Sequence, residues 1–263
     1  MMADFETILL NSDQRGIATL TLNRPDKHNA LNAQMIAELT AAAHLLSRDA
    51  DIRGVVLAAA GSSFCAGGDL GWMQDQAGKD RAGKICGSQA LAGMLAALNA
   101  LPKPLIGRVQ GPAFGGGVGL VSICDVAVAA AGTQFGLTET RLGLIPATIG
   151  PFLVRRVGEG FARQMFFTGR GFDTDLALRS GLIARACAAA ELDRCVEAEI
   201  LPVLQCAPGA VADAKAFCLS IGGQAPADLF EQSSQILADR WESEEAQTGI
   251  KAFFARNDPP WIA

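Results

Sequence analysis

Gln110-Gly-Pro-Ala-Phe-Gly-Gly-Gly117 is a glycine-rich turn between the apolar run Leu105–Gln110 and a second apolar stretch, Val118–Ile123. The same order occurs earlier, where Gly61-Ser-Ser-Phe-Cys-Ala-Gly-Gly-Asp69 follows the apolar run Arg53–Ala60 and leads into a helical stretch. Short continuous apolar runs are typical of strands buried on both faces. The repeated order of strand, glycine turn and helix therefore predicts an α/β fold, with a buried sheet covered by helices.

The chain on either side of these turns extends the pattern. Phe5–Leu10 and Gly16–Leu22 are rich in strand-forming residues and are separated by a short polar turn, which predicts a hairpin. Asn32–Ser47 carries apolar residues at helical spacing. Further along, Asp125–Ala130 predicts another buried strand and Leu137–Leu142 a short helix.

The strand pattern ends near residue 187. From Leu192 onward the sequence is typical of helices separated by prolines and glycines. We therefore expect a core that carries the binding and catalytic site over residues 1–195, and an α-helical region over residues 196–263. No low-complexity linker separates them, so the helical region is expected to pack on its own core or on a neighbouring subunit. The expected breaks are at Pro202, Pro208, Gly222-Gly223, Pro226 and Pro259-Pro260.

The composition narrows the classes of function. The 263 residues carry a net charge of −5, whereas nucleic-acid and anionic-membrane binding need a concentrated cationic surface. A small-molecule partner is therefore favoured. Half of the residues are apolar and the mean hydropathy is +0.25, so the chain can bury a large core. No run approaches the length of a membrane span, and the first residues lack the pattern of a signal peptide.

Several common site motifs are absent from the sequence. The seven cysteines are scattered without a CxxC pair, so we expect a reducing, cytoplasmic setting with no disulfide framework and no metal site. Gly78–Lys84 is similar to a phosphate-binding loop, but the next position, where the motif has a Ser or Thr that binds magnesium, is Ile85. Gly115–Gly119 does not complete the dinucleotide fingerprint. The two histidines, His28 and His44, do not by themselves indicate a catalytic triad.

The two glycine turns are candidate sites for a negatively charged oxygen. A helix begins with unpaired backbone N–H groups and carries partial positive charge there. Ala66 in the first turn and Gly116 in the second occupy matching places. Their amides could form an oxyanion hole that stabilises an enolate as its charge develops. The alternative is that both segments are only turns between strands and helices.

Glu139 is the candidate acid–base residue. It lies in a short helical segment among apolar residues, where a carboxyl group has a raised pKa and can exchange a proton near neutral pH. The alternative is a charge that stabilises the beginning of a helix. Asp69 is expected to cap a helix rather than to react. Cys65 is expected to be buried rather than to act as a nucleophile.

Taken together, these motifs resemble those of the enoyl-CoA hydratase/isomerase family, the crotonase superfamily, over nearly the whole chain. The resemblance implies a spiral of ββα turns with a C-terminal helical region that mediates trimerisation, usually within a hexamer built from two trimers. It also implies an acyl-CoA substrate and no separate cofactor, since coenzyme A is part of the substrate. The matching segments are 23–32, 64–70, 110–117, 135–146 and 245–254 followed by Pro260-Trp261.

The resemblance also implies roles for individual residues. The N–H groups of Ala66 and Gly116 are expected to hold the thioester oxygen, and Glu139 to be the general acid–base group. The residues expected to contact the coenzyme A portion are Lys27, Ala30, Leu31, Ala66, Gly67, Gly68, Asp69, Leu70 and Gly116.

One position departs from the family pattern. Familiar hydratases use two glutamates around one water, and the first follows the triple glycine by two positions, where this chain has Gly119. The remaining Glu139 fits hydration of a 2-enoyl-CoA, and it equally fits isomerisation, in which one group moves a proton between two carbons. A third hypothesis is an acyl-CoA binder without turnover.

A bacterial subgroup that hydrates methylglutaconyl-CoA or isohexenylglutaconyl-CoA resembles this chain in carrying glycine at the same position. Its substrates bear a second carboxylate, which requires a cation near the acyl pocket. Arg141 and Arg155 are the candidates for that contact, with a surface role as the alternative for each.

Overall fold

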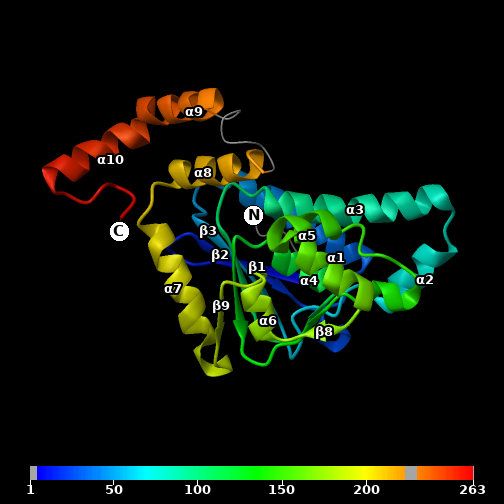
Figure 1. Cartoon of the computed structure of the whole chain (residues 1–263). Helices are drawn as coiled ribbons and strands as arrows, with labels where there is room; N and C mark the ends of the chain where they lie inside the picture. Colours follow the sequence, from blue (N-terminus) through cyan, green and yellow to red (C-terminus); the bar gives the residue numbers. More distant parts are fainter. Residues whose placement is uncertain (1–4, 223–229, 263) are drawn as a thin grey trace.

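Two β-sheets form the centre of the molecule. The structure, a computed structural model, describes residues 5–222 and 230–262. The strands are β1 Ile8–Ser12, β2 Ile17–Leu22, β3 Gly54–Ala59, β4 Leu105–Val109, β5 Ala113–Phe114, β6 Val126–Ala130, β7 Phe135–Gly136, β8 Gly171–Phe172 and β9 Arg185–Cys187. One sheet has the order β1-β2-β3-β4-β6-β9 and the other β5-β7-β8 (Figure 1). The predicted α/β class is confirmed.

The chain passes repeatedly from the first sheet to the second and then into a helix. Thus β4, β5 and α4 follow one another, and β6 and β7 lead through a short 3₁₀ helix into α5. The first sheet is antiparallel only between β1 and β2, and parallel from β2 to β9. The helices are α1 Ala33–Arg48, α2 Leu70–Gly78, α3 Arg81–Asn99, α4 Gly116–Ser122, α5 Gly150–Thr168, α6 Thr174–Arg179, α7 Leu192–Leu204, α8 Pro208–Ser220, α9 Phe230–Glu242 and α10 Glu244–Ala255, with 3₁₀ helices η1 Pro25–Lys27, η2 Glu139–Leu142 and η3 Ala189–Glu191.

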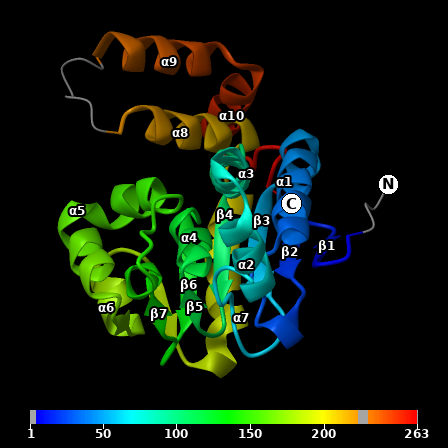
Figure 2. The same cartoon turned by 90° about the vertical axis from the view of Figure 1, so that its right-hand side faces the viewer.

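The central strands of the first sheet, β3, β4 and β6, are buried on both faces, as their continuous apolar sequences predict. In β3, Val55 and Leu57 belong to the main core together with residues of α1 and α3, whereas Val56 packs in a second core with Ile200 of α7. The alternation follows from the two-residue period of a strand. Figure 2 shows α1 and α3 beside the sheet, with α7 on another side of it.

The predicted elements agree with the structure except near their ends. Asn32, expected inside the first helix, instead caps α1, because its side chain accepts a hydrogen bond from the Met35 amide at 2.9 Å. The helix expected over Val118–Ile123 already begins at Gly116. Pro202 does not break its helix, since α7 continues to Leu204.

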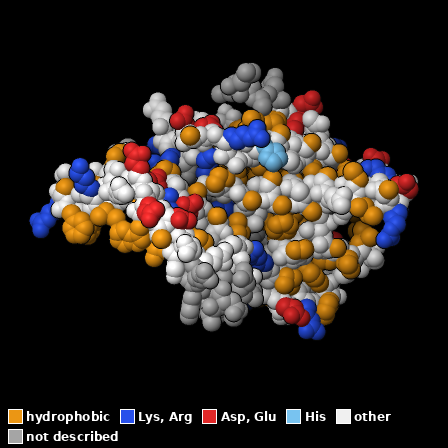
Figure 3. All heavy atoms as spheres, turned by 90° about the horizontal axis from the view of Figure 1, so that it is seen from above, with side chains coloured by type: hydrophobic (Ala, Val, Ile, Leu, Met, Phe, Trp, Pro, Cys, Tyr) orange, Lys and Arg blue, Asp and Glu red, His pale blue; other side chains and the backbone are white. Residues whose placement is uncertain are grey.

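The C-terminal helices extend the fold beyond the layered core (Figure 2). The expected division between residues 195 and 196 falls inside α7, where Cys195 and Val196 pack in the same core. Apolar side chains are visible on the projecting end of the molecule in Figure 3. The expected breaks at Gly223 and Pro226 lie outside the described residues.

No helix in the described part of the chain is both long and apolar enough to cross a membrane alone. One pair, 189–204 with 208–220, meets the length and composition criteria jointly and is bent by 106° between its two parts.

Replacing Gly117 by alanine should destabilise the fold. An added Cβ would lie 2.3 Å from the Cys65 carbonyl oxygen, and backbone has little freedom to move away. We expect a loss of about 3 kcal/mol or more in the free energy of unfolding, as for severe overpacking. Gly93→Ala is the matched control, because Gly93 is exposed in α3 with open space around it, and the change should stabilise by about 0.5–1 kcal/mol. Urea denaturation measures both, and a Gly117→Ala protein of unchanged stability would contradict the close approach.

Candidate active site

A cavity of about 410 Å³ lies where the glycine turns meet α2 and α3. Its wall includes Leu31, Gly68, Gly116 and Glu139, which the sequence placed in four separate motifs. The remaining wall comes from one side of α2, the first half of α3 and the segment 144–149. The fold therefore brings the predicted acid–base residue and part of both glycine turns to one cavity.

Glu139 is a half-buried carboxyl group on the wall of this cavity. Its Oε2 atom has no hydrogen-bond partner among the described residues. Burial raises the pKa of the Glu139 carboxyl above its ordinary value, because the charged form loses solvation. Glu139 is also the first residue of η2, so the helix-start interpretation fits its position in the chain. However, its unpaired oxygen and raised pKa are features of a group that exchanges protons.

The amide of Gly116 is available to a ligand. Gly116 is the first residue of α4, and no side chain caps this helix. Its N–H therefore remains one of the orphan donors of the helix beginning. Gly116 lies on the cavity wall beside Leu31, whose Cδ1 atom would be 2.7 Å from an added Cβ.

In the first turn, the structure favours Gly68 over the expected Ala66. The Ala66 N–H donates to the carbonyl oxygen of His28 at 3.0 Å, so it does not face the cavity as a free donor. Leu31 donates to Gly67 and accepts from Asp69, in a short parallel pairing opposite Gly68. Because successive amides of an extended chain point in opposite directions, the Gly68 N–H points away from this pairing. Gly68 donates to no protein acceptor in the described part of the chain and lies on the cavity wall.

Two residues that the sequence analysis did not single out hold this turn in place. Asn29 is fully buried, and its side-chain amide donates to the carbonyl oxygens of Ala60 at 2.8 Å and Ser63 at 2.9 Å. Arg24 donates to the Ala30 carbonyl at 2.6 Å and forms an ion pair of 3.0 Å with Asp69. Both lie within the segment 23–32, whose high density of polar residues beside a predicted turn was the available signal.

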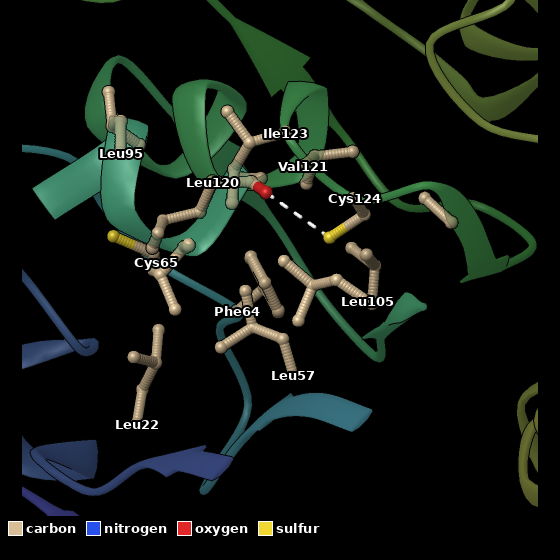
Figure 4. Close-up of a cluster of buried hydrophobic side chains, with 14 of the residues drawn as sticks. Leu22, Leu57, Phe64, Cys65, Leu95, Leu105, Leu120, Val121, Ile123 and Cys124 are labelled. Carbon is tan, nitrogen blue, oxygen red and sulfur yellow. Dashed lines mark hydrogen bonds between the residues drawn. The ribbon is translucent and has the colours of Figure 1, made fainter. Parts of the chain in front are cut away.

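The other expected coenzyme A contacts lie around the turn rather than on the cavity wall. Asp69 caps α2, as predicted, by accepting hydrogen bonds from the amides of Gly71 and Trp72. Lys27 ends η1 on the surface, and the Leu70 side chain is 79% exposed. Cys65 is fully buried in the core around Phe64 and Leu57 (Figure 4), and burial raises the pKa of its thiol to about 12. The expectation of a buried, unreactive Cys65 is confirmed.

The position of the missing first glutamate is closed. A Cβ added to Gly119 would lie 2.7 Å from Cγ2 of Ile149 and 3.6 Å from Cδ1 of Leu95. Gly119 itself is buried. Ile149 therefore fills the space into which a side chain at position 119 would project, and Glu139 is left as the carboxylate on the cavity wall.

Neither candidate arginine lies on the cavity wall. The Arg155 guanidinium donates to the carbonyl oxygens of Cys218 at 3.0 Å and Leu219 at 2.7 Å, near the end of α8. Arg141 packs beside Gly169, after α5. Both arginines are exposed, so the surface role given as the alternative for each fits this structure. The cavity wall carries a different cation, Lys84 of α3, which the sequence analysis did not connect with the site.

A model of the enoyl-CoA hydratase/isomerase family matches residues 12–263. The chain belongs to this family. It is 33% identical over 256 residues to a Mycobacterium bovis protein described as a probable enoyl-CoA hydratase, with 97% of each chain covered. The predicted family resemblance is thus confirmed.

Solved structures of family members show the same crotonase fold. An enoyl-CoA hydratase of Shewanella pealeana superposes with a TM-score of 0.94 at 34% identity, covering 98% of this chain and 96% of the other. AtuE of Pseudomonas aeruginosa has a TM-score of 0.94 at 36% identity, covering 98% and 100%. In this chain, the position of the first glutamate in the family pattern is a glycine, and the space beside it is filled by Ile149.

Restoring a glutamate at position 119 should destabilise this family member unless space is made for it. Gly119→Glu would press a buried carboxyl group against Ile149, and we expect a loss of about 3 kcal/mol in the free energy of unfolding. Ile149→Ala should relieve the collision, so the double variant should be more stable than the sum of the two single changes predicts. A double-mutant cycle by chemical denaturation measures this coupling. Strict additivity would contradict the contact between the two positions.

Proposed function

We propose that the protein adds water across the double bond of a 2-enoyl-CoA thioester. The observation that carries this proposal is the Oε2 atom of Glu139, which is buried without a hydrogen-bond partner among the described residues, on the cavity wall that includes Gly68 and Gly116. Family membership supports an acyl-CoA substrate. The proposed oxyanion hole consists of the N–H groups of Gly68 and Gly116, with Ala66 replaced as the first donor because its amide is engaged by His28.

In the proposed reaction, the Glu139 carboxylate takes a proton from water as the water oxygen bonds to Cβ. The π electrons move through Cα to the thioester oxygen and form an enolate. The two backbone N–H groups stabilise that charge without reorganising, because the fold already fixes them. The protonated Glu139 then returns a proton to Cα, which completes the addition. A raised pKa suits both halves of this exchange.

No separate cofactor takes part in this scheme. The thioester carbonyl makes Cα acidic once the oxygen is held, and the backbone donors supply the electrophilic assistance.

A double-bond isomerase is the second candidate function. The observation that favours it is Ile149 in the space of a second acid–base group, because isomerisation needs only one group that removes a proton and returns it to another carbon. The oxyanion hole would serve both reactions equally. The two functions differ in whether the product gains the mass of one water.

We also propose a branched or carboxylated acyl group, as in 3-methylglutaconyl-CoA, and assembly into a trimer or a pair of trimers in the cytoplasm. Exposed apolar side chains on α9 and α10 support assembly, because such surface is usually covered by a partner. The exposed fractions are 59% for Leu237 and Trp241, 77% for Phe253 and 79% for Phe254.

Glu139→Gln should reduce turnover by about 10²–10⁴-fold, because the amide cannot accept the proton of water. Binding of the CoA ester should persist, since the change keeps the shape of the side chain. The assay uses crotonyl-CoA and 3-methylglutaconyl-CoA and follows product mass and loss of the conjugated-thioester absorbance. Glu159→Gln in α5, an exposed carboxylate outside the cavity, is the matched control.

The outcomes separate the candidate functions. A gain of one water that disappears in Glu139→Gln supports hydration, and unchanged turnover in that variant overturns the assignment. Migration of the double bond in a β,γ-enoyl ester without a gain of mass supports the isomerase. Ester binding without either reaction would identify an acyl-CoA binder.

The pH dependence of kcat/KM should report the buried Glu139. The reaction requires the ionised carboxylate, and burial raises its pKa above the ordinary value near 4.5. As the pH decreases, activity should therefore fall with the protonation of Glu139, at a higher pH than that at which an exposed glutamate is protonated. A profile of kcat/KM against pH measures this limb. An acid limb at or below 4.5 would contradict Glu139 as the buried base.

A further inference from the structure

Among the described residues, two charged side chains lie on the wall of the cavity, Glu139 and Lys84. Lys84 lies on α3, and Ser88 and Leu91 follow it on the same wall. These residues are four and seven positions further along the helix, so they occupy one face. In the described part of the chain, the Lys84 ammonium group has no ion-pair or hydrogen-bond partner.

Lys84 lies far along α3 from the part of that helix that approaches α4. Leu95 continues the same face of α3 and lies 3.6 Å from the Cβ position of Gly119, in the helix that begins at Gly116. At 1.5 Å per residue, the backbone of Lys84 is about 16 Å along the axis of α3 from that of Leu95. The Lys84 end lies instead beside α2, since Gln76 of α2 contacts the Gly87 position of α3. Figure 1 shows α2 next to the beginning of α3.

The polarity of the wall changes along this length. Near the glycine turns it is formed by apolar side chains such as Leu31, Met73 and Ile149. Further along α3, Ser88 Oγ and Thr148 Oγ1 form a hydrogen bond of 2.8 Å across the cavity wall. Lys84 and Gln76 follow on the same wall. An acyl chain that starts at the oxyanion hole therefore passes an apolar zone before it meets hydroxyl groups and a cation.

We propose that the cavity selects a 2-enoyl-CoA whose acyl chain ends in a carboxylate, with Lys84 as the residue that binds that terminal group. This inference rests on the proposed function and specifies its substrate class. An unpaired ammonium group at the end of an apolar passage is complementary to a carboxylate carried on a hydrocarbon chain. Ser88 supplies a neighbouring hydroxyl donor. The hydrocarbon spacer must be long enough for the carboxylate to reach Lys84 from the oxyanion hole.

The test compares two series of 2-enoyl-CoA esters of increasing chain length, one ending in a methyl group and one in a carboxylate. The wild-type protein should prefer the carboxylate by roughly ten-fold in kcat/KM once the chain reaches Lys84, the effect of one charge-assisted hydrogen bond. Lys84→Met should abolish this preference and Lys84→Glu should reverse it. Crotonyl-CoA is too short to reach Lys84, so it serves as the reference ester against which each variant's preference is measured.

Lys79→Met is the matched control, because Lys79 follows α2 nearby but does not lie on the cavity wall. It should leave the preference unchanged. A wild-type protein without the preference, or a Lys84→Met protein that keeps it, overturns the inference. An equal loss for every ester, crotonyl-CoA included, would instead place Lys84 against the phosphates of coenzyme A and would also overturn it.

The proposed function and this inference can fail separately. If the wild type hydrates crotonyl-CoA but shows no terminal preference, only the inference fails. If it hydrates no ester, the proposed function fails, and calorimetric binding of saturated acyl-CoA esters with methyl or carboxylate ends decides the inference. Tighter binding of the carboxylate series that disappears in Lys84→Met supports it, and equal binding of the two series overturns it.

Discussion

The site depends on direct backbone contact between the two glycine turns. The amides of Phe64 and Cys65 donate to the Pro112 carbonyl, and Phe114 donates back to the Cys65 carbonyl at 2.9 Å. The contact is possible only without side chains at its closest points, since a Cβ on Gly117 would fall 2.3 Å from the Cys65 oxygen. Hydrogen bonds between backbones fix relative positions without relying on side-chain rotamers. The two turns therefore behave as one rigid unit, with Gly68 and Gly116 on its surface.

This unit also determines where the carboxylate lies. Gly115 donates to the Gly136 carbonyl at 2.9 Å, so the short strand β7 is paired to the second turn, and Glu139 follows three residues later. The proposed acid–base group is thus positioned by the same backbone hydrogen bonds that hold the amides. Three segments distant in the sequence become one site through main-chain bonds, while Asn29 and Arg24 brace the surrounding loop.

Local patterns in the sequence were sufficient for the sheet, the main helices and Glu139, because apolar runs, glycine turns and an isolated carboxylate are properties of short segments. They were not sufficient for the first oxyanion donor. Choosing Gly68 over Ala66 requires knowing that Leu31 pairs with this segment and engages the amides on one side of it. Lys84 was missed for a similar reason, since its place depends on how α3 lies across the glycine turns. Register and helix placement are long-range properties that no single motif contains.

The lack of space for a side chain at Gly119 gives the raised pKa of Glu139 a particular significance. With Ile149 in that space, the wall provides no second carboxylate to share a proton or orient a water. A single group must then accept a proton and give it back, which is efficient only if its pKa lies between those of a free carboxyl group and the reacting partner. Desolvation by the apolar wall moves the pKa of Glu139 in that direction. Ile149, which fills the space of the second carboxylate, therefore also belongs to the apolar wall that raises the pKa of Glu139.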